Sequence, residues 1–284
     1  MASVRLTPEK LPVMLGPVQE TLLVPLLGRA LETEKSSGLI DDPKAVEIVK
    51  SLDYDFEKWR GTSTLMAATI RTLMYDHEVS NFLKAHPEGT VVEIGCGLNT
   101  RFERLDNGSA HWFELDLPDS MALRRRFFQE QERRTMIAAS FLEPSWYDQV
   151  HSTQGPWLFV SEAVIIYIEA NAVERALRSL AGRFPGAQLL MDTTSTRMVD
   201  RQSRHDVMKT LPKDSWFRWK CDEPRALSAW GLKLIRSKTF LDAEPELVDR
   251  FPLLYRVVTR WAPWLIRSQA SDYKINLFEL APKA

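Results

Sequence analysis

Short apolar runs recur from residue 90 onward, and each has the length of a β-strand. We expect strands at 90–94, 110–115, 136–139, 157–161, 187–192, about 233–241 and 273–280. Segments with helical spacing lie between most of them. In residues 171–184, for example, one apolar stripe consists of Val173, Ala176, Leu177, Leu180 and Phe184. Strands that alternate with helices predict an α/β fold whose mostly parallel sheet is covered on both faces.

The chain before residue 89 has a helical pattern instead. From Gln19 to about His86, apolar residues recur at helical spacing, and Arg71 lies beside an apolar face made of Met66, Ile70, Leu73 and Met74. We therefore expect an N-terminal helical cap over residues 1–88 and a main domain over residues 89–284.

One segment interrupts the alternation of strands and helices. From Thr193 to about Trp230 the chain is polar, basic and aromatic, and it follows the carboxyl end of the fifth strand, where open α/β sheets bind ligands. This position predicts a lid or a substrate wall over about 193–230. Its candidate substrate-binding residues are Arg201, Arg204 and Trp216. The alternative is a surface excursion whose aromatic residues only pack on the core.

The most informative motif stands at the end of the first main-domain strand. Gly95 and Gly97 follow residues 90–94 directly, and the next strand ends in Asp116. In doubly wound sheets such glycines let a nucleoside ligand approach the backbone, and the acid binds the ribose hydroxyls. Thr100 replaces the third glycine of a dinucleotide fingerprint, and the carboxylate of Glu93 would repel a phosphate. S-adenosylmethionine fits this pattern, because it carries adenosine, a sulfonium and an ammonium group but no phosphate. The alternative is a purely structural turn.

Composition narrows the class of protein. A net charge of −1 over 284 residues indicates no general attraction to nucleic acid or to an anionic membrane. Cys96 and Cys221 lack metal-ligand or disulfide spacing, which favours a reducing cytoplasm, and no metal site is evident. The longest apolar run, residues 157–168, contains Glu162 and is too short to span a bilayer. We expect a cytoplasmic protein that acts on a small molecule, and the sequence indicates no oligomeric state.

Several further motifs occur in a fixed order around the glycine loop. They are Glu20-Thr21-Leu22-Leu23, Arg71-Thr72 with Tyr75-Asp76, residues 92–101, Asp116-Leu117-Pro118, Ala139-Ser140-Phe141 with Trp146, and Glu162-Ala163-Val164. With these motifs, most of the chain resembles the leucine carboxyl methyltransferase superfamily, in particular its branch of tetracenomycin-type polyketide O-methyltransferases. The resemblance implies a class I methyltransferase with a Rossmann-like, seven-stranded sheet, an antiparallel last strand, and S-adenosylmethionine as cofactor.

The resemblance also implies roles for individual residues. It places Arg71 at the methionine carboxylate, Asp116 at the ribose hydroxyls, and Glu162 near the methionine ammonium group. The complete set of expected cofactor-binding residues is Arg71, Glu93, Gly95, Gly97, Asp116, Ser140, Phe141 and Glu162. The family's loop often carries Asp at the position of Asn99, and its protein-methylating members have Asp at the position of Ser140; serine can still form a hydrogen bond to adenine.

The chemistry of the acceptor is less constrained by the sequence. A carboxylate is ionised at neutral pH and needs no base, whereas a phenol, with a pKa of about 10, would gain from one. No histidine stands in a recognisable base arrangement, and His205 is the one that we would test. We therefore favour carboxyl methylation of a small aromatic or polyketide acid and assign no catalytic residue. The alternatives are a protein C-terminal carboxyl methyltransferase and a non-catalytic protein that binds S-adenosylmethionine.

Overall fold

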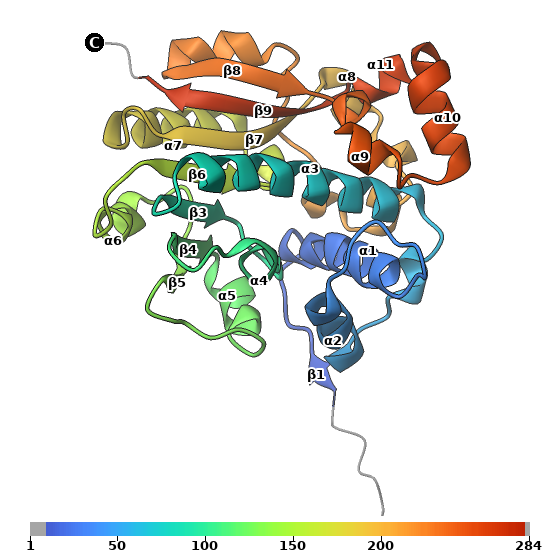
Figure 1. Cartoon of the computed structure of the whole chain (residues 1–284), viewed down its shortest axis with the longest axis horizontal. Helices are drawn as coiled ribbons and strands as arrows, with labels where there is room; N and C mark the ends of the chain where they lie inside the picture. Colours follow the sequence, from blue (N-terminus) through green and yellow to red (C-terminus); the bar gives the residue numbers. More distant parts are fainter. Residues whose placement is uncertain (1–9, 282–284) are drawn as a thin grey trace, which may run out of the picture.

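A seven-stranded sheet forms the centre of the molecule (Figure 1). The computed structural model describes residues 10–281. The strands lie in the order β5-β4-β3-β6-β7-β9-β8. The pairs among β3 to β7 are parallel, and β9 runs antiparallel to both of its neighbours, as the resemblance implied. The strand bounds are Thr90–Ile94 (β3), His111–Asp116 (β4), Arg134–Ala138 (β5), Trp157–Ser161 (β6), Gln188–Thr194 (β7), Leu232–Lys238 (β8) and Tyr273–Leu280 (β9).

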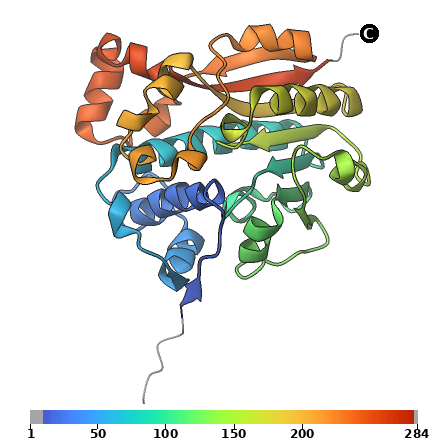
Figure 2. The same ribbon diagram turned by 180° about the vertical axis from the view of Figure 1, so that it is seen from behind.

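The buried strands carry apolar residues on both sides because the sheet is covered on both faces. Val91 and Val92 are consecutive and fully buried, yet they belong to two different hydrophobic cores. Helices α4 (Arg101–Leu105) and α5 (Pro118–Arg124) contribute to the first core, and α6 (Tyr147–Val150) and α7 (Ala170–Arg183) to the second. Figure 2 shows α7 lying along the face of the sheet that is hidden in Figure 1.

The N-terminal helices share the first of these cores. They are α1 (Leu23–Thr33), α2 (Pro43–Ser51) and α3 (Ser63–Ala85), preceded by a 3₁₀ turn η1 (Gln19–Leu22). Two short strands, β1 (Leu11–Pro12) and β2 (Leu52–Asp53), pair beside them. Helix α3 runs across the sheet in Figure 1 and is buried on several sides, so its predicted single apolar face is only part of its packing surface. The division of the chain at residue 88 stays a prediction.

Two insertions extend the carboxyl end of the sheet. The first, residues 195–231, was expected; it holds α8 (Thr196–Asp200) and a series of 3₁₀ turns. The second, residues 239–272, was not predicted and contains α9 (Pro245–Val248), α10 (Leu253–Trp261) and α11 (Arg267–Ala270). The strand expected at 233–241 ends at Lys238, because Thr239 and Asp242 form a capping box that begins a 3₁₀ turn. Within residues 10–281, no helix combines the length and apolarity that crossing a membrane requires.

Candidate functional site

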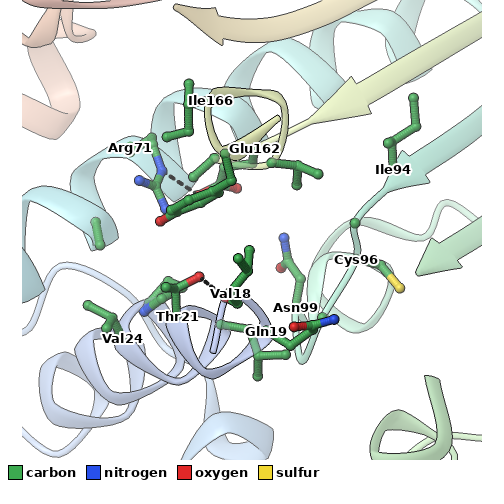
Figure 3. Close-up of a pocket in the computed structure, with 18 of the residues that line it drawn as sticks. Val18, Gln19, Thr21, Val24, Arg71, Ile94, Cys96, Asn99, Glu162 and Ile166 are labelled. Atoms are coloured by element: carbon green, nitrogen blue, oxygen red, sulfur yellow. Dashed lines mark hydrogen bonds and ion pairs between the residues drawn. The ribbon is translucent and has the colours of Figure 1, made fainter. Parts of the chain in front are cut away.

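The loops after β3, β4, β5 and β6 line a single cavity of about 540 Å³ at the carboxyl edge of the parallel strands. This is where doubly wound sheets bind ligands, and the volume lies within the range of small-molecule sites. The rest of the lining comes from η1, α1, the first three turns of α3, the insertions after β7 and β8, and the start of β9. In Figure 3, Arg71 and Glu162 lie on one side of the cavity, and Val18 and Thr21 lie across from them.

The glycine loop has a backbone that other residues could not adopt without strain. Gly95 and Gly97 have φ angles of +67° and +48°, and a Cβ atom on Gly95 would lie 2.3 Å from a methyl carbon of Val164. The amide of Gly97 donates to the Asp116 carboxylate at 2.6 Å, and the amide of Leu117 donates to its other oxygen at 2.7 Å. Asp116 thus joins the ends of β3 and β4 and still lines the cavity.

Buried arginines hold the carbonyl groups of the same loop. Arg124 donates to the carbonyl oxygens of Gly97 and Asn99, both at 2.8 Å, while its other nitrogens pair with Glu114. Arg29 donates to the carbonyl of Leu98 at 2.8 Å. Charge-assisted hydrogen bonds are roughly twice as strong as neutral ones, so these arginines hold the loop carbonyl groups firmly. Sequence analysis missed Arg29 and Arg124, since nothing local marks a helical arginine as a loop anchor.

An ion network joins α3 to the loops after β3 and β6. Glu162 accepts hydrogen bonds from Arg71 Nε at 2.9 Å, from the Thr72 hydroxyl at 2.9 Å and from Arg101 Nη2 at 2.6 Å (Figure 3 shows the Arg71 pair). Burial by itself would raise the pKa of Glu162, but the charges of Arg71 and Arg101 outweigh it and lower the pKa to about 2. Glu162 is therefore a carboxylate at any physiological pH.

Arg101 is the centre of this network, and sequence analysis did not single it out. It also pairs with Asp76 at 2.8 Å and with Glu93, so one fully buried guanidinium contacts three carboxylates. Glu93, expected at the cofactor, lines the cavity with its carboxylate turned to Arg101. Its role toward a ligand stays a prediction. The position of Arg101, directly after the glycine loop, was the only local signal that could have identified it.

A buried tyrosine–aspartate pair lies beside Arg71. The Tyr273 hydroxyl donates to Asp192, and Arg71 Nη1 approaches the same hydroxyl at 3.5 Å. Asp192 also accepts from the amide of Ala163, whose φ of +54° is unusual for a residue with a side chain. Burial raises the pKa of Asp192 to about 6, although Arg71 opposes the shift. An aspartate at the end of an apolar strand was a signal that sequence analysis did not use.

Ser140 and Phe141 also line the cavity, close to the end of β5. The ring of Phe141 is buried, and the Ser140 hydroxyl accepts from the amide of Leu142 at 3.2 Å. Leu117, on the neighbouring loop, is exposed and lines the same part of the cavity. All eight residues expected at the cofactor therefore line one cavity, and their roles toward the cofactor stay predictions.

The insertion after β7 contributes a mostly apolar wall. Met198, Val207, Met208, Leu211 and Phe217 line the cavity together with His205. His205 Nδ1 accepts from the amide of Met208 at 3.3 Å, and Nε2 lies 3.4 Å from the Thr64 hydroxyl, which donates to Asp206. Burial lowers the pKa of His205, with Asp206 opposing, which favours the neutral ring. Both of its nitrogens face protein groups.

The three residues expected to bind the substrate lie elsewhere. Arg201 and Arg204 are exposed, and neither they nor Trp216 are among the residues of 10–281 that line the cavity. Trp216 instead donates its indole N–H to the carbonyl of Met208 at 3.1 Å, and Met208 is one of the residues that line the cavity. Position in an insertion does not determine which way a side chain points. Their substrate role therefore stays a prediction without support from the cavity.

The donor set of the cavity fits S-adenosylmethionine. Arg71 offers a guanidinium for a carboxylate, Glu162 a carboxylate beside it for an ammonium group, and Asp116 a carboxylate for hydroxyls. The cationic residues of the lining, Arg29, Arg71 and Arg101, are all paired with acids, which leaves no surplus positive charge for a pyrophosphate. Residues 10–281 contain no cluster of three His, Cys, Asp or Glu side chains suited to a metal ion.

Several known proteins are similar to this chain. The family described as leucine carboxyl methyltransferase matches residues 23–181, more than half of the chain. The tetracenomycin polyketide synthesis O-methyltransferase TcmP of Streptomyces glaucescens is 29% identical over 245 residues, covering 85% of this chain and 89% of that protein. The S-adenosyl-L-methionine-dependent methyltransferase dpfgK of Gibberella zeae is 25% identical, covering 91% and 94%.

Solved structures share the fold. A candidate methyltransferase from Thermobifida fusca superposes with a TM-score of 0.58 at 13% identity, covering 90% of this chain and 93% of that one. A DUF574 family protein from Streptomyces avermitilis superposes with a TM-score of 0.54, also at 13% identity, covering 89% and 96%. The predicted class I methyltransferase sheet and the predicted resemblance to the polyketide O-methyltransferase branch are thus confirmed. The chain belongs to the leucine carboxyl methyltransferase family, with S-adenosylmethionine as its cofactor.

Proposed function

We propose that this protein is an O-methyltransferase that transfers the methyl group of S-adenosylmethionine to a compact, largely apolar small molecule. The observation that carries the proposal is one cavity with two unlike walls. The loops of the sheet supply charged groups at fixed positions, whereas the insertion after β7 supplies mainly apolar side chains. The name of TcmP supports oxygen as the acceptor atom.

The surroundings of His205 favour a carboxylate as the acceptor. His205 is the only histidine among the described residues that line the cavity, and both of its nitrogens face Met208, Thr64 and Asp206. An acceptor that must lose a proton would need a free base, whereas a carboxylate is already ionised at neutral pH. The positive sulfonium attracts such an acceptor, which offsets the lack of an unpaired arginine in the apolar wall.

The chain's own residues act mainly through orientation. When bound, S-adenosylmethionine supplies an electrophilic methyl group on a sulfonium. Arg71 and Glu162 would hold the amino acid end of the cofactor, and Asp116 would hold its ribose, while the apolar wall excludes water and aligns the acceptor. Such alignment is worth roughly 7–11 kcal/mol in well-oriented systems. No described side chain has to exchange a proton with a carboxylate acceptor.

Two other functions remain as alternatives. A protein C-terminal carboxyl methyltransferase would need room for a peptide, and the cavity of about 540 Å³ must hold the cofactor as well as the acceptor. A non-catalytic protein would bind the cofactor without turnover. The near-neutral chain offers no general attraction to nucleic acid. Both cysteines are free, which supports the cytoplasm as its compartment.

Calorimetry tests the cofactor site first. We expect S-adenosylmethionine and S-adenosylhomocysteine to bind and NAD not to bind. Arg71→Ala should weaken binding of S-adenosylmethionine at least about tenfold, since it removes a charge-assisted pair. Arg126→Ala, an exposed arginine, is the matched control, and thermal unfolding checks that both variants are folded. Unchanged affinity in Arg71→Ala would contradict the assignment of Arg71.

Acceptor screening tests the proposed chemistry. We would assay aromatic carboxylic acids and the corresponding phenols with labelled cofactor, alongside a peptide with a free C-terminus. Turnover of acids, with a rate that does not follow the titration of a phenol, supports the proposal. Turnover of phenols that is lost in His205→Gln would show that His205 reorients and acts as a base. Methylation of the peptide alone would favour the protein-modifying alternative.

A further inference from the structure

One short segment carries most of the exposed apolar surface of the protein. Among residues 10–281, eleven large hydrophobic side chains are exposed, and seven of them lie between residues 253 and 265. Besides Tyr255 they are Leu253, Leu254, Val257, Trp261, Trp264 and Leu265, with exposed fractions between 45% and 75%. We call residues 250–267 the α10 surface. Monomeric proteins rarely leave such a contiguous patch facing water, so this surface indicates a partner.

Helix α10 has an apolar side without a core beneath it. None of its nine residues is buried, although Phe251 just before it and Ala270 after it are. In Figure 1 the helix stands at the edge of the molecule, beyond α9 and α11. The spacing of Leu253, Leu254, Val257 and Trp261 places these residues on one side of the helix. The pattern is therefore that of an amphipathic helix whose apolar side faces outward.

The charges of the α10 surface identify the kind of partner. It contains Arg250, Arg256, Arg260 and Arg267 and no acidic residue; Asp249 precedes it and pairs with Arg260 at 2.7 Å. Arg250 and Arg256 donate to backbone carbonyls rather than to carboxylates. The segment from Asp249 to Arg267 thus has a net charge of +3, within a chain whose total charge is −1. An apolar surface edged by uncompensated arginines is complementary to an apolar surface edged by anions.

A second copy of this chain fits less well. A two-fold interface places the same patch against itself, so Arg250, Arg256 and Arg267 of both copies would meet without acidic partners. Two tryptophans, several leucines and flanking arginines, carried here by α10 and the following 3₁₀ turn η10 (Pro263–Leu265), are instead typical of segments that lie in the interface of an anionic bilayer. The near-zero total charge predicted no general attraction to membranes, but it does not describe this local surface.

We propose that the α10 surface binds the surface of an anionic lipid membrane, with Trp261 and Trp264 at the level of the lipid headgroups. The position of this surface gives the binding a consequence. Phe240 and Gln269, on either side of the segment, both line the cavity. Binding therefore brings the cavity next to the bilayer, where apolar small molecules accumulate. The membrane contact itself does not depend on the proposed methylation chemistry.

Vesicle sedimentation of the full chain tests the proposal. We expect partition onto vesicles of phosphatidylcholine with phosphatidylglycerol, little partition onto phosphatidylcholine alone, and release at high salt. The double variant Trp261→Ser/Trp264→Ser should lower partition at least about tenfold, since it removes two large apolar anchors. The double variant Arg256→Gln/Arg267→Gln should lower it about fivefold for each arginine.

Matched controls separate the surface from general effects. Met14→Ser/Ile235→Ser removes two exposed apolar side chains elsewhere, and Lys84→Gln/Arg126→Gln removes two exposed charges elsewhere; both should partition like the original chain. All variants should keep their thermal stability and their affinity for S-adenosylmethionine. Equal partition onto vesicles with and without phosphatidylglycerol would overturn the proposal. Unchanged partition of Trp261→Ser/Trp264→Ser would overturn it as well. A dimer in ultracentrifugation that becomes monomeric in Trp261→Ser/Trp264→Ser would also overturn it and assign the surface to a second copy.

Discussion

Replacing Glu162 by glutamine tests how much of the site depends on one buried carboxylate. Glu162 accepts three hydrogen bonds, two of them from Arg71 and Arg101, and is 8% exposed, so solvent screens these pairs little. Its pKa of about 2 lies below the ordinary value of 4.5. At about 1.4 kcal/mol per pH unit, this difference corresponds to roughly 3 kcal/mol of folding free energy.

The pH dependence of this contribution has a definite sign. Because the pKa is lower in the folded protein than in the unfolded chain, the stabilisation is complete above pH 4.5 and decreases as the pH falls toward 2. We therefore expect Glu162→Gln to lower the free energy of unfolding by about 3 kcal/mol at pH 7, which corresponds to a loss of roughly 6–12 °C in Tm. The difference between the two proteins should shrink steadily below pH 4.5.

Urea unfolding at several pH values, monitored by circular dichroism, measures the loss of stability at pH 7 and its dependence on pH. Glu169→Gln is the matched control, because Glu169 also pairs with an arginine, Arg218, but at an exposed position. We expect that control to change stability by less than about 1 kcal/mol. Equal stability of Glu162→Gln and the original chain, or a difference that stays constant below pH 4.5, would refute the ion network as the source of the low pKa.

Three further predictions concern the same site. Gly95→Ala should lower the free energy of unfolding by about 1–3 kcal/mol and weaken binding of S-adenosylmethionine in calorimetry, because Gly95 has a φ angle of +67° and its added Cβ would contact Val164. The control Gly182→Ala, in an open position on α7, should leave stability unchanged or raise it. The pKa of Asp192, raised to about 6, predicts that stability falls by about 3 kcal/mol as the pH rises from 3.8 through 6, and urea unfolding of Asp192→Asn should lack this fall. Arg124→Met should weaken cofactor binding at least about tenfold and lower Tm, since it releases two loop carbonyls and a buried carboxylate; unchanged affinity would show that the loop does not need this anchor.

The glycine loop and Asp116 could be predicted to lie together from the sequence alone, because the signals are local. Gly95 and Gly97 follow a strand directly, and Asp116 ends the next strand, so topology alone brings them to one edge of the sheet. The alternation of strands and helices determined the class of fold for the same reason. The resemblance of the motifs added Arg71, Ser140, Phe141 and Glu162, which all line the cavity.

Side-chain direction and long-range partners were decided only by the tertiary structure. Arg204 and His205 are neighbours in the sequence, yet the first is exposed and the second lines the cavity. Arg101 and Asp192 each had one local signal, but their contacts were decided only when partners distant along the chain were brought beside them. The α10 surface was not predicted from the sequence, because an amphipathic pattern is the same whether its apolar side is buried or faces water. Packing against other elements determines which of the two occurs, and that depends on contacts that no local pattern contains.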